Sequence, residues 1–235
     1  MMRVAKECGA NAVKLQKRDN RVLYTTKFYN QPYLNKNSYG KTYGVHRNAL
    51  EFNFNQYKKL FNYSKKIKID FFATPFDIPS LKFLEKLNLP LYKIASADIL
   101  NLPLQTEIAK TKKPIILSTG GATLKDVKAA VKNITRYNKN LSVLQCTASY
   151  PADWKDMNLN VLETYKKKFK NHVVGLSDHE AGIQAASLAF MLGARVFEKH
   201  FTLNRANKGT DHSFSLEPEG LRKVSRNLHR IPILL

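Results

Sequence analysis

The sequence predicts an α/β fold, specifically a (β/α)₈ TIM barrel that lacks its first strand. Short apolar runs alternate with amphipathic helical stretches along the whole chain, a pattern typical of right-handed βαβ units built on a parallel sheet. The 235 residues are enough for one large domain. We therefore expect residues 1–235 to form a single barrel-type catalytic domain.

The strands are predicted from apolar runs that are mostly continuous, as expected when both faces of a strand are buried. They span residues 12–16, 69–74, 91–96, 114–119, 141–147, 173–177 and 194–200. The helices are predicted from amphipathic stretches at 1–8, 48–67, 77–88, 102–111, 123–138, 157–170, 182–192 and 217–230.

The first element is a helix, which Gly9 would close as a C-terminal cap. Seven strands and eight helices are the inventory of a barrel without its opening strand, which would leave an open seam between two unpaired edges. We accordingly expect residues upstream of Met1 to be missing from this chain. The alternative is a doubly wound open sheet, but no Gly-x-Gly-x-x-Gly pattern follows the first strand to bind a dinucleotide.

A long segment at 17–47 is rich in Tyr, Asn and Lys and shows little periodicity. Long loops in compact domains are usually functional or disordered. Because this segment follows a strand, a barrel would place it over the C-terminal face, where substrates bind. The mixture of aromatic and basic residues leaves a second interpretation, stacking on single-stranded nucleic acid.

The charge is strongly positive, since 39 Lys and Arg against 18 Asp and Glu give a net charge of +21. Such a charge favours anionic partners: nucleic acid, acidic lipid, or phosphorylated and carboxylated small molecules. No apolar run is long enough for a membrane span, and the first residues lack the apolar core of a signal peptide. The two cysteines, Cys8 and Cys146, are far apart and form no paired motif. We expect a cytoplasmic protein without membrane association.

Polar residues at the C-terminal ends of parallel barrel strands point into one mouth. Lys14, Lys93 and Lys199 each stand in an apolar run, and buried lysines are rare unless they contact an anion. Three such lysines predict a phosphate or carboxylate site. For any one of them, pairing with a neighbouring barrel carboxylate is an equal alternative.

His179 and His200 end the last two predicted strands, and Asp211 lies in the loop after His200. Two imidazoles with a carboxylate suit a divalent first-row metal with open coordination positions. The glycines of STGG (118–121) could let backbone N–H groups approach an anion, although glycine is also common at such turns. The other histidines, His46, His172 and His229, fall in polar or helical surface contexts and receive no chemical role.

Several strings together resemble the sialic acid (N-acetylneuraminate or nonulosonic acid) synthase family. They run in the family's order over nearly the whole chain: AVKLQ, ATPFD (73–77), YKIASAD (92–98), NLPL (101–104), LSTGG (117–121), CTASYP (146–151), GLSDHEAG (175–182), FEKHFTL and GTDHSFSLEP. The resemblance implies a transferase of sialic acid biosynthesis that condenses phosphoenolpyruvate with an N-acylmannosamine-type sugar and releases phosphate. It also implies a barrel followed by a small antifreeze-like domain, in a protein that is a homodimer when complete.

The resemblance further implies the site residues. It assigns a divalent metal, Mn²⁺ or Mg²⁺, to His179 and His200, and catalytic roles to Asp211, His200 and Tyr150. Substrate-binding roles fall on Lys14, Gln16, Thr74, Lys93, Ser96 and Ser177. The metal would polarise the open-chain aldehyde of the sugar, C3 of phosphoenolpyruvate would attack that aldehyde, and water would capture C2 before phosphate leaves. The acceptors that the family allows include N-acetylmannosamine, its 6-phosphate and bacillosamine-derived sugars.

The chain departs from the family pattern in three places. Nothing corresponds to the Glu of the family's opening strand, Ala148 stands where some members have an Asn, and no antifreeze-like domain follows the final IPILL. Two alternatives to the synthase therefore stay open. One is another barrel phosphosugar aldolase that uses Lys93 or Lys199 as a Schiff-base lysine. The other is an inactive fragment with a basic nucleic-acid-binding surface, although no recognition motif for nucleic acid is present.

Overall fold

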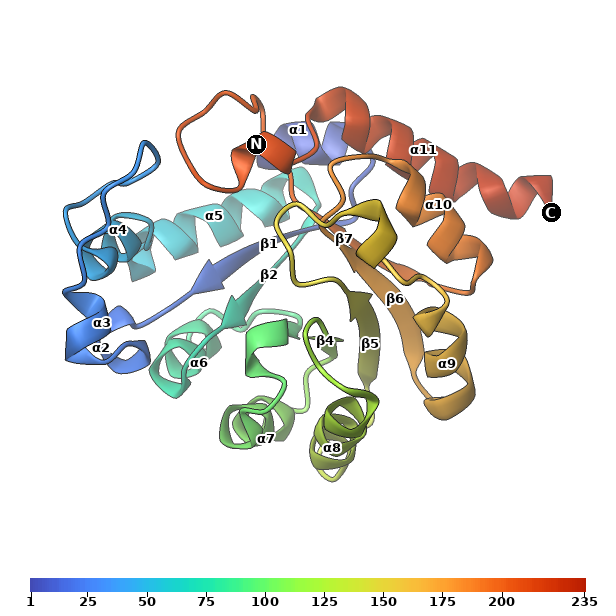
Figure 1. The fold of residues 1–235 in the computed structure, drawn as a ribbon, viewed down its shortest axis with the longest axis horizontal. Helices are drawn as coiled ribbons and strands as arrows, with labels where there is room; N and C mark the ends of the chain where they lie inside the picture. The colour runs from blue at the N-terminus through green and yellow to red at the C-terminus, as the bar shows by residue number, and fades with distance from the viewer.

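The computed structural model describes residues 1–235, which form one curled parallel sheet with helices around its outside (Figure 1). The strand order follows the sequence, and β1 and β7 form the two edges. The strands are β1 (Ala12–Lys17), β2 (Asp70–Pro75), β3 (Tyr92–Ile94), β4 (Ile115–Ser118), β5 (Leu141–Cys146), β6 (Val173–Asp178) and β7 (Val196–Lys199). The predicted parallel α/β architecture and its seven strands are confirmed, and the doubly wound order is excluded because each strand pairs with its sequence neighbour.

Most helices also lie within a few residues of their predicted bounds. They are α1 (Met2–Glu7), α2 (Asn20–Leu23), α3 (Thr26–Tyr29), α4 (Tyr43–Ala49), α5 (Phe54–Ile67), α6 (Ile78–Glu85), α7 (Leu102–Lys110), α8 (Leu124–Thr135), α9 (Val161–Lys168), α10 (Gln184–Met191) and α11 (Pro218–Leu234). No helix is both long enough and apolar enough to cross a membrane.

The helix predicted at 48–67 is wrong at its start, because α4 and α5 are separate helices. Asn53 caps α5: its side chain accepts a hydrogen bond from the Gln56 backbone N at 3.0 Å, and the Gln56 side chain accepts one from the Asn53 N at 2.8 Å. This capping box starts a new helix. The segment 17–47 also contains α2, α3 and the beginning of α4, so it is more structured than its weak periodicity predicts.

Alternation along the strands separates two faces of the sheet. The register pairs Lys14 with Phe72 and Gln16 with Thr74, so these side chains share the inner face of the curled sheet. The outer face carries large apolar side chains that pack under the helices in the main core, including Phe71, Tyr92, Ile94, Leu117 and Val143. The inner face carries polar and charged side chains beside a few apolar ones such as Phe72, and it forms the candidate site.

The helical layer closes where the sheet stays open, because α1 lies against α11 (Figure 1). Ser225 Oγ of α11 donates to the Gly9 carbonyl oxygen at 3.0 Å, and Cys8 Sγ contacts the Pro218 carbonyl oxygen at 3.2 Å. Gly9 has a φ of +93°, and a Cβ there would lie 2.2 Å from Ser225 Oγ. Only glycine therefore fits this turn without displacing α11.

Candidate active site

Two lysines from different strands converge on one carboxylate inside the curled sheet. Glu198 of β7 lies 3.5 Å from Lys14 Nζ of β1 and 3.2 Å from Lys93 Nζ of β3. The Lys93 side chain is almost fully buried, with 4% exposed. Glu198 therefore links the two edges of the sheet through side chains, although β1 and β7 share no backbone pairing.

Two lysines share one carboxylate in this cluster, and the pKa values of Glu198 and Lys14 reflect that imbalance. Burial raises the pKa of Glu198, but the adjacent charges of Lys14 and Lys93 outweigh burial and hold the pKa at about 2. Burial lowers the pKa of Lys14, while Glu198 opposes that shift. With both lysines charged, two cations and one carboxylate leave the inner face with one spare positive charge.

Hydroxyl groups without partners surround this cluster. Thr74 Oγ1 at the end of β2 and Ser118 Oγ at the end of β4 are buried and have no hydrogen-bond partner. Ser177 on β6 is also buried, with 3% exposed. Buried polar atoms are normally satisfied, so unpaired ones at strand ends are consistent with a polar ligand that completes them.

The two predicted metal-ligating histidines lie together at the β6 and β7 ends, with ring centroids 5.4 Å apart. His179 Nδ1 is 2.7 Å from the Thr147 carbonyl oxygen. An oxygen acceptor there requires an N–H on Nδ1, which leaves the lone pair on Nε2. Burial lowers the pKa of His200 to about 4, with Asp211 opposing the shift, so this imidazole is neutral near pH 7.

Two adjacent imidazoles, each with a ring nitrogen that makes no hydrogen bond, fit a divalent first-row ion that takes its remaining ligands from water and substrate. No group of three or more His, Cys, Asp or Glu side chains is arranged to hold a metal. Asp211 Oδ2 lies 3.6 Å from His200 Nδ1, and the Asp211 side chain is about half exposed.

Tyr150 lies against both histidines, as the predicted site requires. Its ring centroid is 4.1 Å from that of His179 and 5.8 Å from that of His200. The side chain remains half exposed at the mouth, and burial is the main cause that raises its pKa to about 12. Tyr150 is thus a neutral hydroxyl at the edge of the imidazole pair.

Lys199 does not join the inner cluster, and the prediction of three lysines around one anion is wrong for this residue. It follows Glu198 on β7, so its side chain takes the opposite face of the strand. Its Nζ is 2.9 Å from Asp178 Oδ2, and it donates to the carbonyl oxygens of Glu180 and Gly182 at 2.6 and 3.1 Å. The alternative of pairing with a neighbouring barrel carboxylate holds for Lys199. Lys14 and Lys93 also pair with a barrel carboxylate, but they share a single one, Glu198.

The glycine turn after β4 contacts another part of the site. Gly120 N donates to Ser96 Oγ at 2.9 Å, so this backbone N–H is already used. A Cβ at Gly120 would lie 3.0 Å from both Ser96 Oγ and the Ala148 side chain. The turn therefore positions Ser96 by close approach, and the prediction that this N–H contacts an anion directly is not supported.

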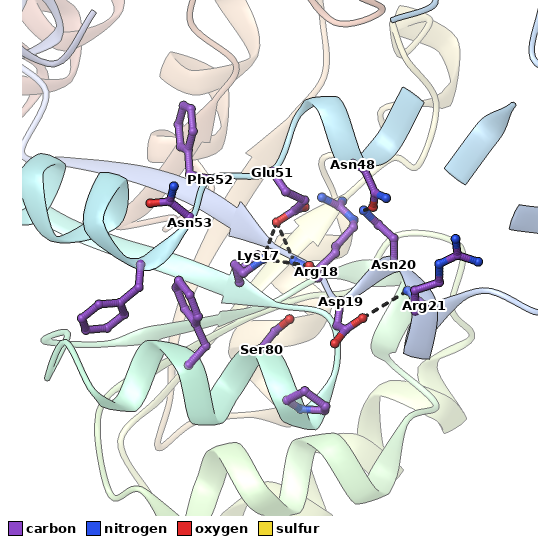
Figure 2. A pocket seen from close by; sticks show the side chains of 13 residues that line it. Lys17, Arg18, Asp19, Asn20, Arg21, Asn48, Glu51, Phe52, Asn53 and Ser80 are labelled. Carbon is purple, nitrogen blue, oxygen red and sulfur yellow. Dashed lines mark hydrogen bonds and ion pairs between the residues drawn. The ribbon is translucent and has the colours of Figure 1, made fainter. Parts of the chain in front are cut away.

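The segment 17–47 covers the C-terminal side of β1. A cavity of about 410 Å³ lies beside this segment. Figure 2 shows side chains that line it, among them those of Lys17, Arg18, Glu51 and Ser80. The segment also contacts the loop after β7, since Tyr39 OH donates to the Lys208 carbonyl oxygen at 2.5 Å. His46, predicted to lie at the surface, is instead 4% exposed and accepts a hydrogen bond from Tyr39 N at 3.1 Å.

Three residues of this site received no role from the sequence, although Asp98 and Glu198 were among the polar residues predicted at strand ends. Glu198 completes the lysine cluster, and its position inside a buried strand between Phe197 and Lys199 was a usable signal. Asp98 is buried with Oδ2 unpaired, and burial raises its pKa. Arg18 donates to Gln16 Oε1 at 2.6 Å, a contact that no spacing rule predicts.

The fold and this site define a class: a parallel α/β half-barrel with cations and imidazoles on its inner face. The sequence profile of the NeuB family matches residues 1–235, and the chain belongs to this family. It is 40% identical over 231 residues to N-acetylneuraminate-9-phosphate synthase of Mus musculus. That match covers 98% of this chain and 64% of the mouse protein. The chain thus spans slightly less than two thirds of this curated relative.

Other relatives support the same membership. N,N'-diacetyllegionaminic acid synthase of Campylobacter jejuni is 37% identical over 98% of this chain and 70% of its own length. The crystal structure of N-acetylneuraminic acid synthetase from Leptospira borgpetersenii, in complex with citrate, superposes with a TM-score of 0.87 at 32% identity. That match covers 100% of this chain and 77% of the other chain.

Proposed function

We propose that this chain carries the site of a synthase that condenses phosphoenolpyruvate with an N-acylmannosamine-type sugar and releases phosphate. The observation that carries the proposal is the convergence of Lys14 and Lys93 on the single carboxylate of Glu198. The spare positive charge suits a small substrate with both a phosphate and a carboxylate. The mouse relative is a synthase of N-acetylneuraminate 9-phosphate and the Campylobacter relative one of N,N'-diacetyllegionaminic acid, which supports a nonulosonic acid as the product class.

The residues divide into two groups by position. Lys14 and Lys93 would hold the phosphate and carboxylate of phosphoenolpyruvate by charge-assisted hydrogen bonds, assisted by hydroxyls. Those hydroxyls belong to Thr74, Ser96 and Ser177, with the Gln16 amide nearby. Tyr150 and Asp211 lie at the imidazole side and would face the sugar.

The reaction joins C3 of phosphoenolpyruvate to C1 of the open-chain sugar. Water adds to C2, and phosphate leaves with cleavage of its C–O bond, so the water oxygen stays in the product. His179 and His200 would hold a Mn²⁺ or Mg²⁺ ion, which supplies a Lewis acid for the sugar aldehyde. Lys14 and Lys93 fix the other substrate at a set distance, and holding two reactants in register supplies much of the acceleration.

The open sheet belongs to the same proposal. Parallel strand edges such as those of β1 and β7 carry unpaired backbone groups. Lys14 of β1 reaches Glu198 of β7 across the gap. We take this gap as the position of one further parallel strand in a closed eight-stranded barrel.

The proposal is tested by following inorganic phosphate with the intact gene product. Release should require phosphoenolpyruvate, a divalent ion and an N-acylmannosamine together. His200→Ala should abolish release, whereas His229→Ala, on the exposed face of α11, is the matched control and should keep it. Release that is independent of the sugar, or full activity of His200→Ala, would overturn the assignment.

A Schiff-base aldolase is the enzyme that this test must separate from the synthase. Lys199 is committed to Asp178 and two carbonyl oxygens, which leaves Lys93 as the remaining one of the two candidate Schiff-base lysines. Borohydride should trap no substrate adduct in a synthase, since its chemistry forms no imine. A trapped adduct at Lys93 would favour the aldolase.

A further inference from the structure

The end of the curled sheet opposite the mouth, where helices end and strands begin, carries a concentration of positive charge. Five segments that each run from a helix end to the next strand contain 13 Lys and Arg and no Asp or Glu, which is a third of the 39 cations in the chain. We call these five segments the basic end: residues 65–69, 86–91, 110–114, 136–140 and 166–172. The proposed reaction uses none of their side chains.

Contacts between neighbouring segments place the middle of the basic end together. Lys113 Nζ lies 2.9 Å from Glu85 Oε1, at the end of α6 and next to the second segment. Asn138 Nδ2 of the fourth segment donates to the Lys113 carbonyl oxygen at 2.6 Å. Lys112 Nζ also donates to the Tyr137 carbonyl oxygen. The second, third and fourth segments therefore lie side by side.

The two outer segments continue the same surface. Lys65 and Lys68 of the first segment and Asn88 of the second line one cavity of about 460 Å³. The last two segments lead into β5 and β6, which pair directly, with Ser142 beside Val173. The basic end is therefore one continuous surface rather than five separate patches.

Little on this surface neutralises the cations. Ion pairs involve only Lys110 and Lys113. The other 11 cations belong to no ion pair, and all 11 are exposed. Every Asp of the chain except Asp70 lies toward the mouth, in a strand-to-helix connection, at a strand end or in a first helical turn. The charge of the molecule is thus polarised along the strand direction.

Helix dipoles explain only part of this pattern. The partial negative charge at a helix C-terminus stabilises a cation in the last turn, and the effect falls off outside that turn. Six of the 11 exposed and unpaired cations lie beyond the helix ends, namely Lys68, Lys86, Lys112, Arg136, Lys139 and Lys170. Like charges gathered on one surface repel one another and attract polyanions. The basic end is therefore suited to a partner with many negative charges.

An aromatic ring among the cations indicates which polyanion fits. Tyr137 is 39% exposed, and its ring centroid lies 6.0 Å from Lys110 Nζ. Surfaces that bind single-stranded nucleic acid combine cations, which follow the phosphates, with aromatic rings, on which bases stack. A membrane surface favours apolar side chains that insert, and Tyr137 is the one exposed large hydrophobic side chain of the basic end.

We propose that the basic end binds single-stranded nucleic acid through its phosphates and without sequence preference. Its cations contact the strand, and Tyr137 stacks on a base. This binding is independent of the proposed function, because the basic end and the mouth lie at opposite ends of the strands.

Fluorescence anisotropy with a labelled oligo(dT) measures this binding directly. Contact with about four phosphates predicts roughly 50-fold weaker binding at 200 mM than at 50 mM salt. Lys112→Gln, Lys139→Gln and Lys168→Gln together should lower the affinity at least about tenfold and reduce the salt slope by up to about 2. No binding at 50 mM salt, or binding that does not depend on salt, would overturn the proposal.

A second triple variant separates the basic end from the overall charge. Lys27→Gln, Lys36→Gln and Lys125→Gln remove three exposed and unpaired lysines on the mouth side, so the net charge falls by the same amount. This control should keep the affinity within about twofold, and melting curves confirm that both triple variants fold. An equal loss of affinity in the two variants would overturn the assignment to the basic end.

Two further measurements test the class of partner. Tyr137→Leu should weaken oligo(dT) binding about fivefold or more at an unchanged salt slope, because a stacked base is lost but no phosphate contact. Unchanged affinity would overturn the assignment to single strands. Vesicles of phosphatidylserine and phosphatidylcholine at about 0.15 M ionic strength should leave the protein in the supernatant. Sedimentation with the vesicles, without binding to oligo(dT), would overturn the proposal in favour of a membrane surface.

Discussion

Two neighbouring residues on β7 belong to two buried ion clusters that differ in how completely their charges are paired. Glu198 points inward, where Lys14 and Lys93 lie at 3.5 and 3.2 Å. Lys199 points outward, where its Nζ lies 2.9 Å from Asp178 and donates its other two hydrogen bonds to carbonyl oxygens. The outer cluster has one charge of each sign and no unused donor. The inner cluster has a spare cation and unpaired hydroxyls beside it. Under the proposed function, a buried lysine marks a binding site only where its charge is not already satisfied.

Removing a lysine from the inner cluster should have the largest effect, and the effect should be on activity. We expect Lys93→Met to lower kcat/KM for phosphoenolpyruvate about 100-fold, since a charge-assisted hydrogen bond is worth up to about 3 kcal/mol. Steady-state phosphate release measures it. The loss of unfolding free energy should be smaller than for Lys199→Met, because Lys14 still neutralises Glu198. Unchanged kcat/KM would remove Lys93 from the substrate site.

Removing the outer lysine should have the opposite pattern. Lys199→Met leaves Asp178, which is 3% exposed, as a buried charge without a counter-ion. We expect the unfolding free energy in urea to fall by about 3 kcal/mol, with kcat/KM retained. Replacing both partners with apolar residues, as in Lys199→Met with Asp178→Leu, should recover part of the loss. Loss of activity at full stability would instead place Lys199 in the reaction.

Acid should affect the two carboxylates in opposite directions. The pKa of Glu198 falls from its ordinary 4.5 to about 2 on folding, so its stabilisation is complete above 4.5 and is lost as the pH falls toward 2. That contribution is at most about 3 kcal/mol. Burial raises the pKa of Asp178 above its ordinary 3.8, so its protonation favours the folded state as the pH falls.

Urea unfolding measured between about pH 5 and pH 2 tests this contrast. Glu198→Gln should flatten the rise of unfolding free energy with pH, and Asp178→Asn should steepen it. Changes of the same sign in both variants would contradict the assigned shifts.

An exposed ion pair on α11 should have the smallest effect on stability of the ion pairs compared here. Lys223 Nζ and Glu219 Oε1 lie 2.7 Å apart on α11, and the Glu219 side chain is 78% exposed. Solvent and salt screen such pairs. We expect Glu219→Gln to leave the urea midpoint of unfolding unchanged within error. A clear shift would show that surface charge matters more in this strongly cationic chain than burial predicts.

The strands were predictable because apolar runs and helical periods are local properties of the sequence. The face of each strand side chain was also available in principle: if His200 lies in the mouth, Lys199 immediately before it must point away. The pairing of Glu198 with two lysines was not available, since it depends on three strands meeting across the curled sheet.

The segment 17–47 shows a different limit of sequence-based prediction. Its helices α2 and α3 span four residues each, too short to show a helical period. The contact of Arg18 with Gln16 and Phe76 depends on how this segment folds back over β1 and β2. The start of α5 could have been found, because Asn53 and Gln56 have the spacing of a capping box.

The contact between α1 and α11 has a consequence for the order of folding. The hydrogen bond from Ser225 to Gly9 spans 216 residues, so it cannot form until nearly the whole chain has left the ribosome. Contacts this distant in sequence carry a large loop-closure cost before they return any stabilisation. The βα units from β1 to β6 can pair as they are synthesised, whereas α1 must wait for the last helix. We therefore expect closure of the helical ring to be the final and slowest folding step.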